Sequence, residues 1–302
     1  MDFTIDQEIT AFSAPDGVPC VRITELAYFD ISQIFDCGQC FRFDPVANPT
    51  HAVEFEGVAL GRYIRIGQDT PDSIEIYNTT PAEYDDVWRH YLALDADYAA
   101  IRREIAERFA QASGGNDPVM ARAMAYGSGI RILRQDPWEA VCSFIISQNN
   151  NIPRIKKIIA ALSQAYGESI LCAGRTYHAF PTPHALAEAG TDAIFALRTG
   201  FRAKYIYDAA EKVLHGELDF DAVSAADPVR AETLLCRIKG VGPKVAACAM
   251  LFGFDKTEAF PIDVWMKRVL EKYYPGGLDV TALGRCAGIA QQYLFYYERY
   301  NG

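Results

Sequence analysis

Apolar and polar residues alternate along much of the first eighty positions. Segments 53–56, 64–66 and 74–76 each place charged residues between apolar ones. Successive side chains of a β-strand point to opposite faces, so this period of two predicts strands with one buried face. The turn-forming stretches DPVANPT and GQDTPDS separate the segments, and we therefore expect an antiparallel sheet with one face exposed to water.

The apolar period lengthens to that of a helix after residue 83. Apolar residues recur at helical spacing over 83–110, which predicts one or two helices, and the breaker-rich stretch 111–118 (QASGGNDP) is the best candidate linker. Nearly everything beyond it is predicted to be helical, including a helix that begins at Asp136-Pro137. The predicted fold class is α+β, with an N-terminal antiparallel β domain and flanking helices over 1–112 and a helical domain over 113–302.

One short stretch of the helical domain, LCRIKGVGPKVA, predicts two helices joined by a tight turn, a hairpin over 231–252. Gly240 and Gly242 are able to adopt a positive φ, and Pro243 suits the first turn of the following helix. The N-terminus of such a helix presents unsatisfied N–H groups and the positive end of the helix dipole, which favour a phosphate. Gly240 and Gly242 are therefore candidate phosphate contacts, although a GVG turn alone is also a common helix connection.

Lys244 follows this turn directly, and Asp263 lies nineteen residues later, just before another apolar helix. The intervening segment 245–254 is almost wholly apolar, so a lysine at its mouth is expected to be partly desolvated, which favours the neutral amine that a nucleophile needs. Asp263 is placed to cap its own helix and to remain an anionic neighbour of the lysine. Taken singly, each residue is more often a solvated contact or a simple cap.

Composition and cysteine usage indicate an ordinary globular protein. The 302 residues are half hydrophobic, with no N-terminal signal pattern and no apolar run of membrane-spanning length, so we expect a cytoplasmic location, at the nucleoid if the source is bacterial. The eight cysteines show no disulfide-like rhythm and are expected to be reduced. Cys37 and Cys40 resemble a redox or half-zinc motif, but no second pair completes a four-ligand site.

The net charge of −10 argues against nucleic-acid binding until the charges are located. Residues 1–112 hold 20 acidic and 8 basic residues, whereas residues 113–302 hold 19 acidic and 21 basic ones. The helical domain is therefore close to neutral. Its basic residues fall into three clusters: Arg154, Lys156 and Lys157; Arg198, Arg202 and Lys204; and Arg237, Lys239 and Lys244.

The hairpin and the interval from Lys244 to Asp263 resemble the helix-hairpin-helix DNA glycosylases with a Gly/Pro-rich loop and an aspartate. Further stretches resemble the 8-oxoguanine DNA glycosylase/lyases among them, in the same order: CGQCFRF, GIRILRQDPWEAVCSFIISQNNNIPRI, FPTPHALA and GFRAKY. The resemblance covers most of the chain. It implies a bifunctional DNA glycosylase and abasic-site lyase, in which Lys244 attacks C1′ of the damaged nucleoside and Asp263 stabilises the developing sugar cation.

The same resemblance implies roles for the residues that bind the DNA. An enzyme that flips a base out of a duplex must hold that base and fill the vacated space. By resemblance, Gly38, Cys248, Gln291 and Phe295 form the base pocket, with the Gly38 carbonyl sensing the N7 hydrogen of 8-oxoguanine. Asn149 would fill the space, Phe201 would act as a wedge, and Arg154 and Arg202 would donate to the orphaned cytosine.

Two departures and two alternatives accompany the resemblance. Trp265 stands where well-known relatives have a histidine, and Phe201 where some have a tyrosine, which puts one phosphate contact and the stringency for the opposite base in doubt. The alternatives are a related glycosylase for another damaged base and a non-catalytic helix-hairpin-helix DNA-binding module.

We expect double-stranded DNA with oxidised guanine as the partner, no membrane, a monomer, and no cofactor. No iron–sulfur cluster is expected because only Cys286 follows Asp263, and an ion at the hairpin carbonyls stays open.

Overall fold

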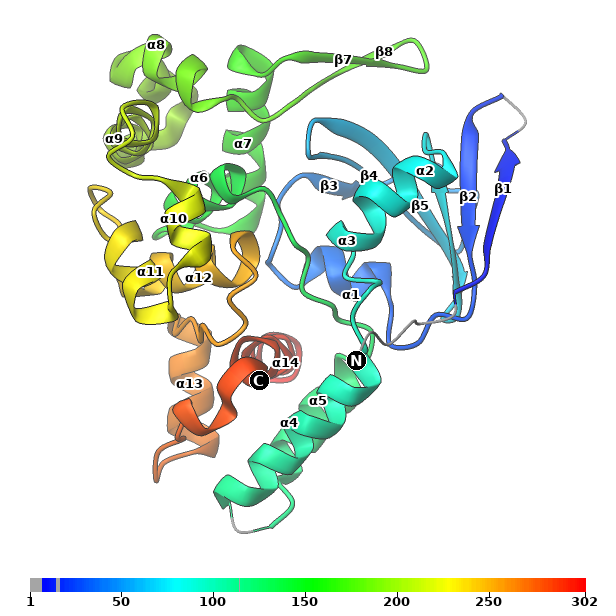
Figure 1. Ribbon diagram of the computed structural model, residues 1–302, viewed down its shortest axis with the longest axis vertical. Coiled ribbons are helices and arrows are strands. Elements are labelled where there is room, and N and C mark those ends of the chain that lie inside the picture. The colour runs from blue at the N-terminus through cyan, green and yellow to red at the C-terminus, as the bar shows by residue number, and fades with distance from the viewer. Residues whose placement is uncertain (1–6, 15–16, 114) are drawn as a thin grey trace.

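The N-terminal part of the chain is built on a six-stranded antiparallel sheet in the computed structural model, which describes residues 7–14, 17–113 and 115–302. The strands run in the order β1-β2-β6-β5-β4-β3 (Figure 1). This confirms the predicted N-terminal antiparallel β region. The strands are β1 Ile9–Ser13, β2 Pro19–Ile23, β3 Phe43–Pro45, β4 Val53–Ala59, β5 Arg62–Thr70 and β6 Ser73–Tyr77.

The inner face of this sheet forms one of the hydrophobic cores of the molecule. Ile64 and Ile66 of β5 and Ile74 and Ile76 of β6 are almost fully buried, as their period-two spacing predicts. The face is covered by α1 (Ile31–Asp36) and by a helical segment that comprises α2 (Pro81–Glu83), the π-helical turn η1 (Tyr84–Trp88) and α3 (Arg89–Tyr91).

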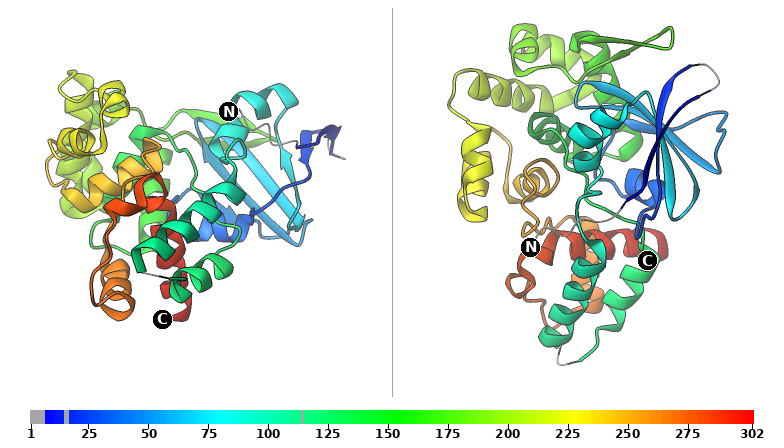
Figure 2. Two further views of the ribbon diagram at one scale, coloured as in Figure 1. Left: turned by 60° about the horizontal axis from the view of Figure 1, so that its bottom comes forward. Right: turned by 45° about the vertical axis from the view of Figure 1, so that its right-hand side comes forward.

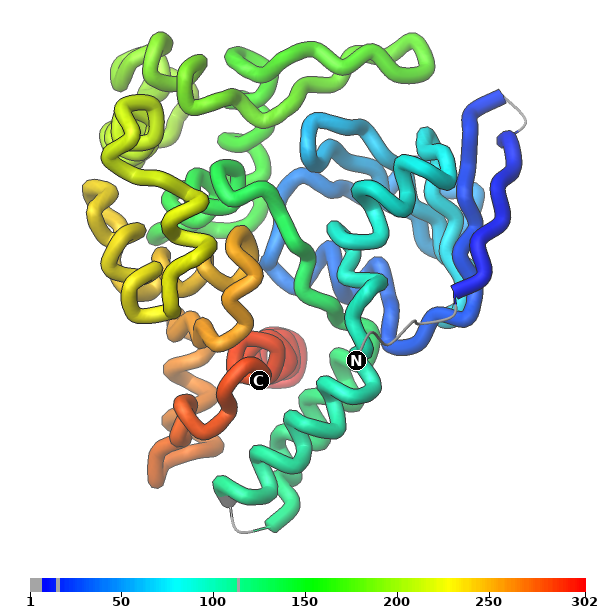
Figure 3. The backbone as a smooth tube through the Cα atoms, viewed as in Figure 1, coloured from blue at the N-terminus to red at the C-terminus, as the bar shows by residue number. Residues whose placement is uncertain are grey.

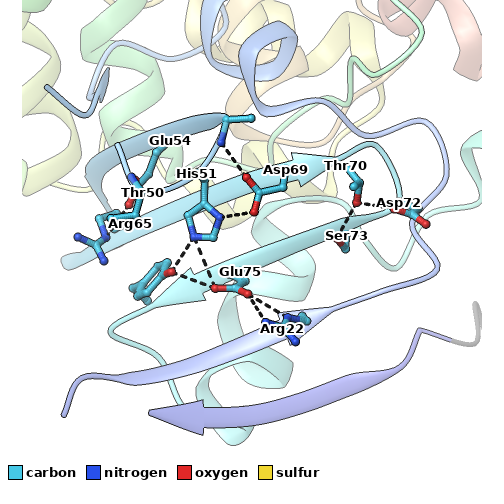
Figure 4. A network of polar contacts seen from close by, with 12 residues as sticks. Arg22, Thr50, His51, Glu54, Arg65, Asp69, Thr70, Asp72, Ser73 and Glu75 are labelled. Atoms are coloured by element: carbon cyan, nitrogen blue, oxygen red, sulfur yellow. Dashed lines mark hydrogen bonds and ion pairs between the residues drawn. The ribbon is translucent and has the colours of Figure 1, made fainter. Parts of the chain in front are cut away.

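Part of the outer face of the sheet is less exposed to water than the sequence predicts. The polar side chains on this face form a network of hydrogen bonds and ion pairs (Figure 4). His51 bridges Asp69 (Nδ1 to Oδ2, 2.9 Å) and the hydroxyl of Tyr77 (Nε2 to Oη, 2.6 Å). Glu54, expected to face water, is only 3% exposed because its carboxylate pairs with Arg65 at 2.9 Å. The network ties the loop before β4 to β5 and β6.

Gly67 on β5 makes room for this network. A Cβ at this position would overlap the imidazole of His51. We expect Gly67→Ala to displace the ring and lower the free energy of unfolding by about 1–3 kcal/mol, measured by urea denaturation. Gly276→Ala, where a Cβ meets open space, is the matched control. An equal loss for Gly67→Ala in a His51→Ala background would contradict this explanation.

The remainder of the chain is mostly helical, as predicted, and wraps around a second core. Many of its helices begin at a side-chain cap followed by proline, for example Asp117-Pro118 and Asp136-Pro137. Of the predicted linker 111–118, part of which lies outside the described residues, residues 111–113 belong to the end of α4 and Pro118 begins α5, so the connection is shorter than predicted. The helices are α4 Tyr98–Ser113, α5 Pro118–Tyr126, α6 Pro137–Ser147, α7 Ile152–Tyr166, α8 Pro183–Ile194, α9 Ala203–Leu214, α10 Phe220–Ala225, α11 Pro228–Leu235, α12 Pro243–Gly253, α13 Val264–Tyr273 and α14 Ala287–Asn301, with short turns η2 Phe195–Thr199, η3 Gly200–Arg202 and η4 Thr281–Cys286.

A β-hairpin interrupts this helical region, which the sequence analysis did not predict. Strands β7 (Ser169–Cys172) and β8 (Arg175–His178) extend from the end of α7 toward the N-terminal sheet (Figure 1). Tyr177 of β8 stacks on Tyr63 of β5, with ring centroids 3.9 Å apart. The hairpin therefore helps to join the sheet to the helices.

The C-terminal helix also connects the two parts of the molecule. Helix α14 packs against α5 and α13, and its last turns approach the end of α1 (Figures 2 and 3). Among the described residues, no helix is both long and apolar enough to cross a membrane.

Candidate active site

A cavity of about 1040 Å³ opens where the N-terminal sheet region meets the helices. Five segments line it: the turn after α1, the end of α6 with the loop and first turn of α7, the turn before α12 with α12 itself, the loop before α13 with its first turn, and α14. Nine of the twelve residues singled out from the sequence lie in this lining. They are Gly38, Asn149, Gly240, Gly242, Lys244, Cys248, Asp263, Gln291 and Phe295.

The hairpin of α11 and α12 forms one wall of the cavity. Gly240 has the predicted positive φ of 78°, and a side chain there would overlap the ring of Tyr205. The expectation for Gly242 was wrong: its φ is −113°, because it is the extended N-cap residue of α12. No side chain caps α12, and a Cβ on Gly242 would meet open space, so the first N–H groups of the helix remain accessible to an anion.

Lys244 and Asp263 face the same cavity from different helices. Lys244 is the second residue of α12 and is partly buried. Asp263 caps α13 as expected, with Oδ1 accepting from the backbone N–H groups of Trp265 (3.0 Å) and Met266 (2.9 Å). This capping fixes the carboxylate while leaving Oδ2 for a second partner. A cation that develops in the cavity would therefore meet a preorganised anion.

Cys248 lies one helical turn after Lys244 and is 5% exposed. Burial raises the pKa of its thiol to about 11, with nearby Lys244 acting in the opposite direction. The group is therefore a neutral thiol at physiological pH, an apolar surface against which a planar ring can pack.

Gln291 and Phe295 lie on the face of α14 that lines the cavity, as their four-residue spacing predicts. Gln291 is 4% exposed, and its Oε1 is buried without a hydrogen-bond partner among the described residues. Such an orphan acceptor is costly unless a ligand supplies the donor. A Cβ on Gly38 would lie 3.6 Å from the ring of Phe295, so the glycine and the aromatic ring stand side by side.

The three asparagines after α6 have different tasks. Asn150 donates its side-chain amide to the carbonyl of Ile146 at 3.0 Å, and Asn151 caps α7 by accepting from the N–H of Arg154 at 3.0 Å. Asn149 is exposed, has a positive φ of 48° and lines the cavity. Of the three, Asn149 is thus the one whose side chain has no hydrogen bond to the neighbouring helices among the described residues.

Arg154, Phe201 and Arg202 lie outside the cavity lining. Arg154 and Phe201 are exposed, the latter by 47%. Arg202 is 2% exposed and donates to backbone carbonyls, from Nε to Gln148 (2.9 Å) and from Nη2 to Asn149 (3.0 Å). Arg202 therefore holds the loop that presents Asn149, a task that the sequence analysis missed.

Several further cavity residues were not predicted from the sequence. Phe144 and Phe252 stack at 5.2 Å and form an aromatic wall with Phe41. Arg299 also lines the cavity. Its position four residues after Phe295 was an available signal, because such residues share one helix face.

Neither thiol of the Cys37–Cys40 pair has the properties of a redox or metal site. Both cysteines are free and buried, and burial raises the pKa of each thiol, for Cys37 to about 12. A nucleophilic or metal-binding cysteine needs the opposite shift. Within the described residues no group of three or more potential metal-ligating side chains is found.

Comparison with known proteins assigns both halves of the chain. Residues 21–141 match the family model described as 8-oxoguanine DNA glycosylase, N-terminal domain, and residues 142–277 match that of the HhH-GPD superfamily base excision DNA repair proteins. A solved structure of the Clostridium acetobutylicum 8-oxoguanine glycosylase/lyase, bound to double-stranded DNA with cytosine opposite 8-oxoguanine, is 35% identical. It aligns over 100% of this chain and 99% of its own, with a TM-score of 0.86.

Curated relatives match over shorter stretches. A probable N-glycosylase/DNA lyase of Methanothermobacter thermautotrophicus is 34% identical over 58% of this chain, and the match spans 65% of that relative. An N-glycosylase/DNA lyase of Arabidopsis thaliana is 27% identical over 87% of this chain and 76% of its own length.

Proposed function

This chain belongs to the 8-oxoguanine DNA glycosylases of the HhH-GPD superfamily, as its sequence predicts, and we propose that it excises 8-oxoguanine from duplex DNA and then cleaves the strand. The relatives named N-glycosylase/DNA lyase confirm the predicted enzyme class. One observation carries the residue assignment: Lys244 and Asp263 line the same cavity as Gly38, Cys248, Gln291 and Phe295.

Lys244 supplies the nucleophile in this proposal. Its neutral amine forms a bond to C1′ while the glycosidic bond breaks and the base leaves with the bonding electrons. The amine then loses a proton, the sugar ring opens, and a Schiff base links Lys244 to C1′. Removal of a C2′ proton from this species expels the 3′ phosphate by β-elimination. Asp263, with Oδ1 held by two amides, stabilises the positive charge on the sugar.

The flipped base lies between the neutral thiol of Cys248 and the ring of Phe295 in this proposal. The buried Oε1 of Gln291 accepts from the donor groups on the Watson–Crick edge of a guanine. The carbonyl of Gly38 accepts from N7–H, which 8-oxoguanine has and guanine lacks.

Asn149 fills the space that the flipped base leaves, and the ring of Phe201 inserts as a wedge at the neighbouring base step. Arg154 donates to the orphaned cytosine, and Arg202 adds the one Nη1 hydrogen that its contacts with the carbonyls of Gln148, Thr199 and Asn149 leave free. The amides at Gly240 and Gly242 and the start of α12 bind a backbone phosphate. We also propose that the chain divides into two domains, 1–112 and 113–302. The protein would act as a monomer, and in a bacterial cell it would be located at the nucleoid.

A panel of duplexes tests this function. We expect strand cleavage at 8-oxoguanine, with little at oxidised pyrimidines or alkylated purines, when the same oligonucleotide carries each lesion in turn. Cleavage of an alkylated purine in preference to 8-oxoguanine would favour the related glycosylase, and no cleavage of any duplex would favour the DNA-binding module.

The same panel also tests recognition of the partner base when the base opposite 8-oxoguanine is varied. Arginine is a pure donor, and cytosine offers two adjacent acceptors where adenine presents a donor beside its acceptor. We expect Arg154→Ala to reduce the ratio of excision rates opposite cytosine and adenine roughly tenfold, because a good bidentate contact contributes about 1–3 kcal/mol of discrimination. Lys157→Ala, an exposed base on the same helix, should leave the ratio unchanged. Equal excision rates opposite all partner bases in the wild-type protein would indicate that Arg154 and Arg202 contact phosphates instead of the partner base.

A further inference from the structure

The turn at residues 36–39 is held by side chains that donate to its backbone carbonyls. Arg299 Nη1 donates to the carbonyl of Asp36 at 2.9 Å, and Gln292 Nε2 donates to that of Cys37 at 2.6 Å. Gln135 Nε2 donates to that of Gln39 at 2.7 Å. By contrast, no hydrogen bond from the described residues reaches the carbonyl of Gly38, and Gly38 is one of the residues that line the cavity.

These donors come from distant parts of the chain. Gln292 and Arg299 belong to α14, and Gln135 precedes α6. Gln292 is 2% exposed, so its bond to Cys37 is screened little by water. Gln39 adds rigidity, because its buried side chain donates to the carbonyl of Arg131 at 2.8 Å and accepts from the N–H of Leu133 at 2.8 Å.

We infer that Gln292 and Gln135 are positioning residues for recognition of the lesion, because they fix the carbonyls on either side of Gly38 and so hold the Gly38 carbonyl as an unused acceptor. This inference rests on the proposed function. A hydrogen bond that distinguishes 8-oxoguanine by one N–H depends on the placement of the acceptor, and a shift of about 1 Å at a reacting or recognising group is able to cost roughly a hundredfold in rate.

The lyase reaction provides an internal control for this role. An abasic site has no base to recognise, yet its cleavage uses the same Lys244. We expect Gln292→Leu and Gln135→Leu, which remove the donor but keep the approximate volume, to lower excision of 8-oxoguanine roughly tenfold or more. Cleavage of an abasic site should stay within about twofold, since chemistry at C1′ does not depend on the Gly38 carbonyl.

Gln68→Leu is the matched control, because Gln68 is also buried and donates to a backbone carbonyl, that of Phe29 at 3.1 Å, away from the cavity lining. It should lower stability without changing the ratio of excision to abasic-site cleavage. Gln292→Glu adds a pH test. A carboxyl donates a hydrogen bond only when protonated, so the ratio should rise as the pH falls in this variant and not in Gln292→Leu.

The outcomes separate this inference from the function on which it rests. Excision and abasic-site cleavage that fall together, or a ratio that does not change in either leucine variant, would overturn the positioning role while leaving the proposed function intact. A wild-type protein that cleaves abasic sites but leaves 8-oxoguanine in place would overturn both.

Discussion

Lys244→Gln is expected to abolish both base release and strand cleavage, with single-turnover rates on an 8-oxoguanine duplex reduced by at least about a thousandfold, or about 4 kcal/mol of activation free energy. An amide nitrogen cannot act as a nucleophile, because its lone pair is delocalised into the carbonyl. Glutamine retains much of the length of lysine, so the cavity should keep its shape. The measurement is cleavage of a labelled duplex with enzyme in excess.

The control for this variant is Lys267→Gln, which removes the same charge from the same cavity lining. It should weaken DNA binding modestly and increasingly so at low salt, because one cationic contact is lost. At saturating enzyme its excision rate should stay within about tenfold of wild type. If Lys267→Gln were as inactive as Lys244→Gln, the loss would reflect charge in the cavity rather than a nucleophile at Lys244.

Asp263→Asn is expected to bind DNA normally but to lose roughly a hundredfold or more in the excision rate. Asparagine caps a helix almost as well as aspartate, so the start of α13 should be preserved. Its neutral amide, however, cannot offset the positive charge that develops on the sugar. Single-turnover excision together with a binding titration separates these two effects.

Asp263→Ala should add a loss of stability of about 0.5–2 kcal/mol, because the N–H groups of Trp265 and Met266 lose their acceptor. Asp227→Ala is the matched control, since Asp227 caps α11 by accepting from the N–H of Arg230 at 3.0 Å. It should show a similar stability loss with excision unchanged. Full activity in Asp263→Asn would reduce Asp263 to a helix cap.

Local patterns in the sequence predict most of the fold. The period-two segments became β4, β5 and β6, and the cap-then-proline pair Asp136-Pro137 begins α6. The β7–β8 hairpin was missed because its strands are short and its exposed Leu171 breaks the expected alternation. Its stabilising contact, Tyr177 on Tyr63, joins residues far apart in the sequence, and no local pattern reports such a pairing.

In the site, too, residues within local motifs were predicted, whereas contacts between residues distant in the sequence were not. Helical spacing placed Gln291 and Phe295 on one helix face, and the resemblance to the family placed them in one site with Lys244 and Asp263; all four line one cavity. The carbonyl contacts of Arg202 and the donors around Gly38 were not foreseen, because they depend on distant pairings, such as that of Gln292 with Cys37 across 255 positions. A resemblance to a family names the residues that act on DNA but not those that hold them in place.

Borohydride trapping followed by peptide mapping tests the central claim most directly. Reduction of the Schiff base during reaction with an 8-oxoguanine duplex should link the protein covalently to the DNA, and digestion should locate the modified amine at Lys244. The Lys244→Gln variant should give no adduct under the same conditions. An adduct of undiminished yield in that variant, or one mapped to another lysine in the wild type, would contradict the account.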